Sequence, residues 1–173
     1  MLGASDMAIN VPKEYEVPLY LFHQGKNAEA YKLFGSHFTV KDGKKGVVFR
    51  VWAPKAAEVC VVGDFNHWNR ESAYMNKISD GGIWELFIPG LKKFDNYKYS
   101  IKTSRGQIKL KADPYGYHME TRPNTASKIY DISGYKWKDS KWMEEKKTKN
   151  VYRSPMNIYE VHLNSWFTKT DEE

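Results

Sequence analysis

Several short runs in the middle of the chain alternate apolar and polar residues with a period of two. In the clearest run, residues 97–102, two tyrosines and an isoleucine alternate with two lysines and a serine. Successive side chains of a β-strand point to opposite faces of its sheet, so one face of this strand is expected in a core and the other in water. Similar alternation occurs at residues 47–51, 84–88 and 108–111, and residues 59–62 are apolar throughout, as in a central strand. The chain is therefore predicted to be mainly β.

Turn-forming residues separate these runs, for example Asp42-Gly43, Pro89-Gly90 and Arg105-Gly106. About six short strands without helices between them fit a two-layer immunoglobulin-like β-sandwich better than a parallel α/β sheet. We expect this sandwich to span residues 35–132.

The segments on either side of the sandwich differ from it in composition. Residues 1–19 are predicted to be a disordered leader. Residues 20–34 are predicted to form a short helical segment with Asn27 as its cap. Residues 133–155 are polar and charged with interspersed tryptophans, which is typical of a linker. Residues 156–173 begin a new strand-like run with no domain after it, which indicates a truncated second domain.

Charge, cysteine and histidine content argue against several classes of function. Lys and Arg exceed Asp and Glu by 27 to 21, but the positive charges are scattered between apolar residues, so a nucleic-acid-binding surface is not favoured. The one cysteine, Cys60, cannot form an internal disulfide, and the five histidines show no spacing typical of zinc ligands. No run approaches the roughly 20 apolar residues of a membrane helix. We therefore expect a cytoplasmic protein with no metal, no cofactor and no membrane partner.

Four strings occur in the order found in family-48 carbohydrate-binding modules. They are VWAP at residues 51–54, VGDFNHW at 62–68, GIWELFIPG at 82–90 and YKY at 97–99. The middle of the chain therefore resembles this module. The module accompanies glycogen- and starch-active enzymes of glycoside hydrolase family 13, and a relative forms the glycogen-binding part of the β-subunit of the AMP-activated kinase. The resemblance implies that the chain binds α-glucan.

Four further strings narrow the resemblance to bacterial glycogen branching enzymes. They are LFGSH at residues 33–37, KADPY at 111–115, RPNTAS at 122–127 and IYEVHLNSW at 158–166. The last string resembles the first strand of the (β/α)8 catalytic barrel of those enzymes, which move α-1,4-glucan segments to a 6-hydroxyl to form α-1,6 branches. Their catalytic carboxylates lie further along that barrel, so no catalytic residue is assigned here, Glu160 and His162 included.

The resemblance also implies which residues bind carbohydrate, namely Trp68, Lys98 and Asn66. Trp68 would stack on a sugar ring and Lys98 would donate hydrogen bonds to sugar hydroxyls. The sequence leaves other roles open, since Trp68 could pack over its own loop, Lys98 could be a solvated lysine, and Asn66 with Asp64 could cap the turn. A second stacking ring of the kinase-type module is missing, because residues 108–111 are isoleucine, lysine, leucine and lysine.

The remaining tryptophans are predicted to have structural roles. Trp84 shares its strand face with apolar neighbours, and it is expected in the core, as is Trp52. The resemblance places Trp137, Trp142 and Trp166 at the seam between the module and the barrel, as interdomain packing residues. The expected partners are therefore α-glucan, such as glycogen or maltooligosaccharides, and a catalytic barrel.

Two alternative functions remain open from the sequence. One is a stand-alone module that targets glycogen without enzymatic parentage, although the barrel-like string near the end argues against it. The other is part of a related family-13 debranching enzyme or trehalose-forming hydrolase, although the string at residues 159–166 argues against both. A nucleic-acid-binding function is the least favoured.

Overall fold

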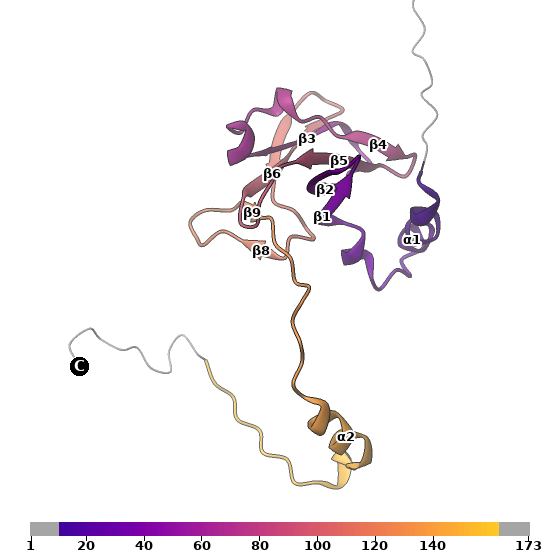
Figure 1. Cartoon of the computed structure of the whole chain (residues 1–173), viewed down its shortest axis with the longest axis vertical. Helices are drawn as coiled ribbons and strands as arrows, with labels where there is room; N and C mark the ends of the chain where they lie inside the picture. The colour runs from indigo at the N-terminus through magenta and orange to yellow at the C-terminus, as the bar shows by residue number, and fades with distance from the viewer. Residues whose placement is uncertain (1–10, 163–173) are drawn as a thin grey trace, which may run out of the picture. The chain divides into compact units, whose positions relative to one another are not determined.

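The computed structural model describes residues 11–162 of the chain, which divides into two compact units, residues 1–133 and 134–173. Within the described part, all the β-strands lie in the first unit and form two antiparallel sheets (Figure 1). None of the helices in residues 11–162 is long and apolar enough to cross a membrane. Predictions that concern residues 163–173, including the role of Trp166, lie outside the described residues.

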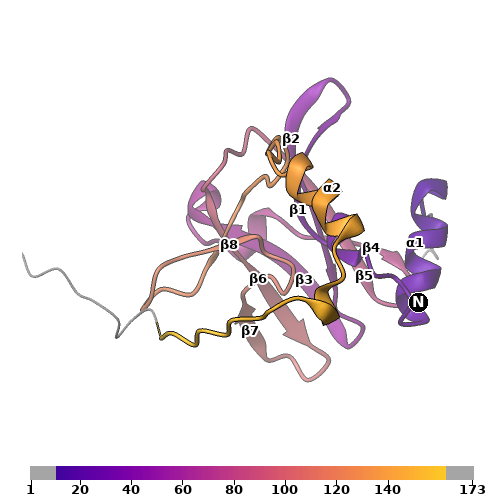
Figure 2. The ribbon, with the colours of Figure 1, turned by 90° about the horizontal axis from the view of Figure 1, so that it is seen from below.

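All the strand pairs of the two sheets are antiparallel, with register irregularities between Ala56 and Glu58 and between Lys77 and Ser79. The first sheet has the order β1 (Gly35–Lys41), β2 (Lys44–Trp52), β5 (Ile83–Pro89) and β4 (Asn76–Ser79). The second has the order β3 (Ala56–Gly63), β6 (Asn96–Thr103), β9 (Ser127–Lys128) and β8 (His118–Met119), and β7 (Ile108–Lys111) also pairs with β6. Figure 2 shows the β1–β2 hairpin extending past its neighbours, and residues 38–45 are exposed.

The inner faces of the two sheets meet in one apolar core, which confirms the predicted β-sandwich. The buried members are Val47, Phe49, Val51, Val59, Val61, Met75, Trp84, Tyr97, Tyr99 and Ile129. The rings of Phe49 and Tyr97 cross between the sheets with their centroids 5.0 Å apart. The alternation of β6 is as predicted, because both tyrosines are fully buried and Ile101 packs against the same cluster.

The burial predicted for strand β7 from the alternation is wrong. Ile108 and Leu110 were expected on a buried face, but 57% and 56% of their surfaces are exposed. The pairing register explains this, because Leu110 lies opposite Ser100 and Ile108 lies opposite Lys102. Their side chains therefore share the outer face of β6 rather than the inner face.

The segment before the sandwich also differs from the prediction. Helix α1 covers Lys13–His23, so it begins within residues 1–19, which were expected to be a disordered leader, and ends within residues 20–34, which were expected to be helical. It contains Pro18, which lacks a backbone N–H donor, and it is held by packing of Leu19 in a second apolar cluster with Phe34 and Ile83. The predicted helix after Asn27 is only a 3-10 turn at Ala30–Lys32, although the Asn27 side chain does accept the N–H of Glu29 at 2.9 Å.

The second unit contains a helix where a linker was expected. Helix α2 covers Ser140–Thr148 and is followed by a 3-10 turn at Val151–Arg153. Lysine and glutamate favour helix, and the pair Lys147–Glu144 at 2.6 Å adds a few tenths of a kcal/mol. Residues 156–162 form no strand in this structure, and the predicted second domain that begins in residues 156–173 stays a prediction.

A buried carboxylate braces β6 from inside. Asp113 accepts the hydroxyls of Tyr97 at 2.7 Å and Tyr99 at 3.0 Å on one oxygen, and the N–H of Tyr115 at 2.8 Å on the other. Its own N–H donates to the Ser127 hydroxyl at 2.8 Å. Burial raises the pKa of the Asp113 carboxyl, while the hydrogen bonds from Tyr97, the Tyr115 N–H and Tyr99 lower it. The raised pKa shows that burial outweighs these bonds.

Replacing Asp113 with alanine is expected to lower the free energy of unfolding by about 3–5 kcal/mol, because three buried donors lose their acceptor. Urea denaturation measures the change. The matched control is Asp131→Ala, since exposed Asp131 accepts only from Ser133, and its loss should cost less than about 1 kcal/mol. Equal effects of the two substitutions would contradict the bracing role.

The pH dependence of stability follows from the raised pKa of Asp113. The folded state holds this proton more tightly than the unfolded state, so the stability of the native chain relative to Asp113→Asn is greatest below about pH 4, the usual pKa of an aspartate in an unfolded chain. That difference is lost as the pH rises through the folded-state pKa. Urea denaturation of both chains across this range measures it, and a difference that grows with rising pH would refute the expectation.

Candidate functional site

The loop after β3 has an unusual backbone conformation that begins at a tightly packed glycine. A Cβ on Gly63 would lie 2.1 Å from the Asn96 carbonyl oxygen and 2.6 Å from the Phe65 ring, so only glycine fits there. A 3-10 turn at Asp64–Asn66 follows, and then His67 and Trp68 have φ angles of 53° and 59°. Two successive non-glycine residues in the left-handed region are strained by roughly 1–2 kcal/mol each.

Asn66 holds this loop together from within. Its Oδ1 accepts the N–H of Gly63 at 2.9 Å, and its Nδ2 lies 3.1 Å from the Val61 and Asn69 carbonyls and 3.0 Å from the Ser72 hydroxyl. Both ends of the amide therefore have partners inside the loop. This arrangement corresponds to the turn-capping role that the sequence left open, and not to a side chain directed at a ligand.

Trp68 is fixed by its ring edge and keeps part of its surface in solvent. The indole N–H donates to Asp64 Oδ1 at 3.0 Å, and Asp64 Oδ2 accepts from Asn96 Nδ2 at 2.8 Å. Asp64 thus ties the ring to β6. Trp68 is 40% exposed, and within residues 11–162 no other aromatic ring pairs with it. The ring is neither fully buried as a lid nor free to rotate.

Two further polar side chains lie on the outer side of β6. Asn96 and Lys98 are two residues apart and therefore share a face, and Lys98 Nζ donates to the Thr125 hydroxyl at 2.7 Å. Lys98 is thus not a solvated lysine without contacts. Sequence reasoning missed Asn96 and Thr125. Thr125 belongs to the RPNTAS string, and nothing in the sequence pairs that string with Lys98.

Further along, this outer face is mixed, because aliphatic side chains of β7 lie beside an ion pair between Lys102 of β6 and Glu58 of β3, with Nζ and Oε1 2.8 Å apart. Ile108 and Leu110 of β7 lie on the side of the sheet that carries Ser100 and Lys102. They are exposed, but they offer no planar ring. The structure therefore places the Trp68 ring near the end of a face that is polar along β6 and aliphatic along β7. A second exposed ring, Tyr74, pairs with Cys60 in the row that also carries Ser100 and Leu110.

Trp84 and Trp52 differ in their surroundings. Trp84 is buried in the core, as predicted, and donates its indole N–H to the Ala53 carbonyl at 3.0 Å. Trp52 was expected in the core as well, but it is half exposed on the outer face of the first sheet. Its N–H bonds to the Gly81 carbonyl at 2.8 Å, and its ring meets the Phe22 ring of α1 edge-on at 5.5 Å.

The two described tryptophans of the second unit are exposed. Trp137 meets the ring of Tyr135 at 4.9 Å, and the ammonium group of Lys146 lies 4.9 Å from the Trp142 ring centre. Their predicted packing against another domain stays a prediction. In the part of the chain that the structure covers, no group of three or more His, Cys, Asp or Glu side chains could hold a metal ion.

The chain is similar in sequence to known proteins over nearly its whole length. Residues 33–116 match the model of carbohydrate-binding module 48 (isoamylase N-terminal domain). The chain is 50% identical over 165 residues to the 1,4-alpha-glucan branching enzyme GlgB of Bacillus subtilis strain 168, covering 95% of this chain and 26% of that protein. It is 46% identical over 159 residues to GlgB 1 of Clostridium perfringens strain SM101, covering 91% of this chain and 24% of that protein.

Among solved structures, ligand-free PulA from Klebsiella pneumoniae aligns with 62% of this chain and 10% of that chain, at a TM-score of 0.48 and 27% identity. The family assignment rests on the sequence matches. The chain spans about a quarter of the length of the curated relatives that it matches. Residues 33–116 match the family of carbohydrate-binding module 48, in a chain that is similar over nearly its whole length to bacterial 1,4-alpha-glucan branching enzymes.

Proposed function

We propose that the first unit of this chain binds α-glucan on the outer face of β6, with Trp68 as the stacking platform. The observation that carries the proposal is the bond between the Trp68 indole and Asp64, which holds a partly exposed ring in a strained loop. Strained backbone conformations cluster at functional sites. A ring that is already fixed at the surface loses little conformational freedom when a ligand binds.

The chemistry of the face suits a sugar chain. The flat C–H side of a glucose ring packs on an indole plane, while its hydroxyls need donors and acceptors beside that plane. Lys98 and Thr125 supply an ammonium group and a hydroxyl that already contact each other. Asp64 and Asn66 act as positioning residues, because their polar groups hold the loop and not the ligand.

We also propose a role for the chain within a larger enzyme. The matched relatives are named 1,4-alpha-glucan branching enzymes, and this chain would supply glucan capture for such an enzyme in the cytoplasm. Exposed Trp137 and Trp142, with Trp166, would pack against its catalytic barrel. A weak site linked to a catalytic site raises the local concentration of substrate without new contacts at the reacting bond.

Trp68→Ala is expected to weaken binding of maltoheptaose by about tenfold or more, because the stacking plane is lost. Titration calorimetry or amide shift titration of the whole chain measures the affinity. Trp137→Ala is the matched control, since it removes an exposed indole from the second unit and should leave the affinity unchanged. Unchanged binding in Trp68→Ala, with the fold intact by circular dichroism, would overturn the proposal.

Salt separates glucan binding from the nucleic-acid alternative. Sugar hydroxyls are neutral, so the maltoheptaose affinity is expected to change less than about twofold between about 50 and 200 mM salt, whereas binding to phosphates would fall by orders of magnitude. The net charge of +6 makes this comparison necessary. Strong binding of a DNA or RNA oligonucleotide at the higher salt, with no response to maltoheptaose, would favour the alternative.

A further inference from the structure

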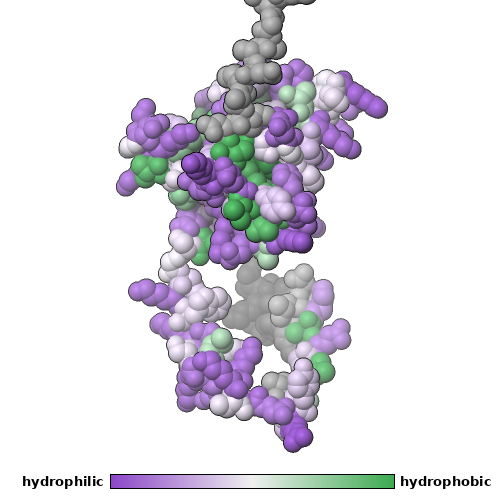
Figure 3. Space-filling model, turned by 90° about the vertical axis from the view of Figure 1, so that its right-hand side faces the viewer, coloured by the Kyte–Doolittle hydropathy of each residue, from purple (hydrophilic) through white to green (hydrophobic). Residues whose placement is uncertain are grey.

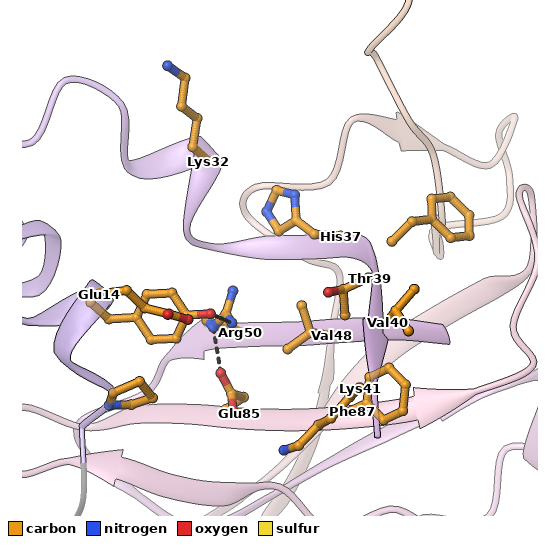
Figure 4. Close-up of a pocket in the computed structure, with 13 residues that line it drawn as sticks. Glu14, Lys32, His37, Thr39, Val40, Lys41, Val48, Arg50, Glu85 and Phe87 are labelled. Carbon is orange, nitrogen blue, oxygen red and sulfur yellow. Dashed lines mark hydrogen bonds and ion pairs between the residues drawn. The ribbon is translucent and has the colours of Figure 1, made fainter. Parts of the chain in front are cut away.

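Helix α1 leaves half of the outer face of the first sheet uncovered. Leu19 of α1 packs against Ile83, at the end of the sheet where Trp52 pairs with Ile83. The space-filling view of the side that carries α1 shows apolar groups at the centre of the first unit among hydrophilic side chains (Figure 3). Beyond the N-terminal end of α1 the uncovered half forms a cleft of about 500 Å³ between α1, β1, β2 and β5 (Figure 4). This volume is within the range of small-molecule sites.

The floor of the cleft is apolar and partly flat. Val48 lies between His37 of β1 and Phe87 of β5 in the sheet register, so the three side chains form one row across the face. A Cβ on Gly46 would lie 2.7 Å from the tip of the Phe87 ring, so the ring lies over the backbone of β2 at that glycine. A larger residue at position 46 would push the ring away from the sheet.

The ion pair between Arg50 and Glu85 forms one end of the cleft, and the two charges of this pair cancel each other. Arg50 is only 6% exposed, and its Nε donates to Glu85 Oε2 at 2.6 Å, the pair that is dashed in Figure 4. Its other nitrogens donate to the Leu33 carbonyl at 3.3 Å and to the Tyr15 hydroxyl at 2.5 Å. A buried guanidinium with all these partners fixes the wall of the cleft and leaves little net charge there.

The rim of the cleft carries both hydrogen-bond donors and hydrogen-bond acceptors. Thr39 and Lys41 come from β1, and Glu14 comes from α1. Lys32 also lines the cleft, but its ammonium group pairs with Glu29 at 2.5 Å. The rim therefore offers a hydroxyl, donors and a carboxylate acceptor without an excess of one charge.

We propose that this cleft is a second binding site, for a neutral polyhydroxyl ligand such as a short α-glucan. The partly exposed Phe87 ring, beside the buried Val48, fits the C–H side of a sugar, and the mixed rim fits hydroxyls, which both donate and accept hydrogen bonds. Because Arg50 pairs with Glu85 and the rim carries both Lys41 and Glu14, the charges in the cleft balance and favour neither an anion nor a cation. The choice of α-glucan among polyhydroxyl ligands rests on the proposed function.

The two sites lie on different sheets of the sandwich. The cleft is built on β1, β2 and β5, whereas Trp68 and Lys98 belong to the loop after β3 and to β6. Because their inner faces form the common core, their outer faces point away from each other. One domain would then hold two glucan segments at once.

Amide shift titration of the labelled whole chain with maltotriose tests the proposal. We expect one group of shifts around Trp68 and a second, separately saturating group around Thr39, Val48 and Phe87. Phe87→Leu keeps an apolar side chain but removes the ring, and should weaken the second group about fivefold while leaving the first unchanged. Thr39→Val, at an exposed position, should weaken it about threefold without a threat to folding.

The matched control is Phe94→Leu, which removes an exposed ring outside the cleft and should affect neither group. Shifts around Trp68 alone would overturn the second site and leave the proposed function intact. Shifts at the cleft alone would support the second site and refute the role of Trp68. A cleft that responds to inorganic phosphate and not to maltotriose would also overturn the proposal.

Discussion

The carboxylate of Asp113 accepts two tyrosine hydroxyls from the inner face of β6, and the position of that strand depends on these bonds. A buried carboxylate is costly to desolvate, so it is tolerated only where donors surround it. Here the donors are Tyr97, Tyr99 and the N–H of Tyr115. Because side chains of a strand alternate, the same bonds fix where Asn96 and Lys98 lie on the opposite face.

The loop after β3 connects the Trp68 ring to strand β6 through hydrogen bonds. Asp64 joins the indole N–H to the Asn96 side chain, and Asn66 closes the turn beneath. The left-handed conformations at His67 and Trp68 persist because these contacts over-determine the loop. A ring that is already immobile loses little conformational freedom when a sugar binds, which favours affinity at a shallow surface.

Much of the sandwich could be predicted from the sequence, because periodicity reports which side of a strand is buried. It placed Tyr97, Tyr99 and Trp84 in the core correctly. It failed at β7, since the face that Ile108 and Leu110 occupy depends on the register with β6. It also failed at α1, since the residues that hold this helix come from distant Phe34 and Ile83.

At the candidate site, too, local features could be predicted from the sequence, whereas contacts between residues far apart in the chain could not. Local composition and family resemblance indicated Trp68 and Lys98 as candidate binding residues and predicted a turn around Asn66, and the binding roles stay predictions. The sequence could not supply the contact between Lys98 and Thr125, which are 27 residues apart, or the tie between Asp64 and Asn96. The cleft beside α1 was also hidden, because it needs both the unpredicted helix and the sheet register.

The central claim is that the ring of Trp68, held by Asp64, is the surface on which glucan lies. Intermolecular nuclear Overhauser effects between maltoheptaose and the assigned indole protons of the chain test it most directly. The account predicts contacts from the sugar ring protons to the Trp68 indole that disappear in Asp64→Ala, in which the ring loses its anchor. Contacts to the exposed indoles of Trp137 or Trp142 instead, with none to Trp68, would contradict it.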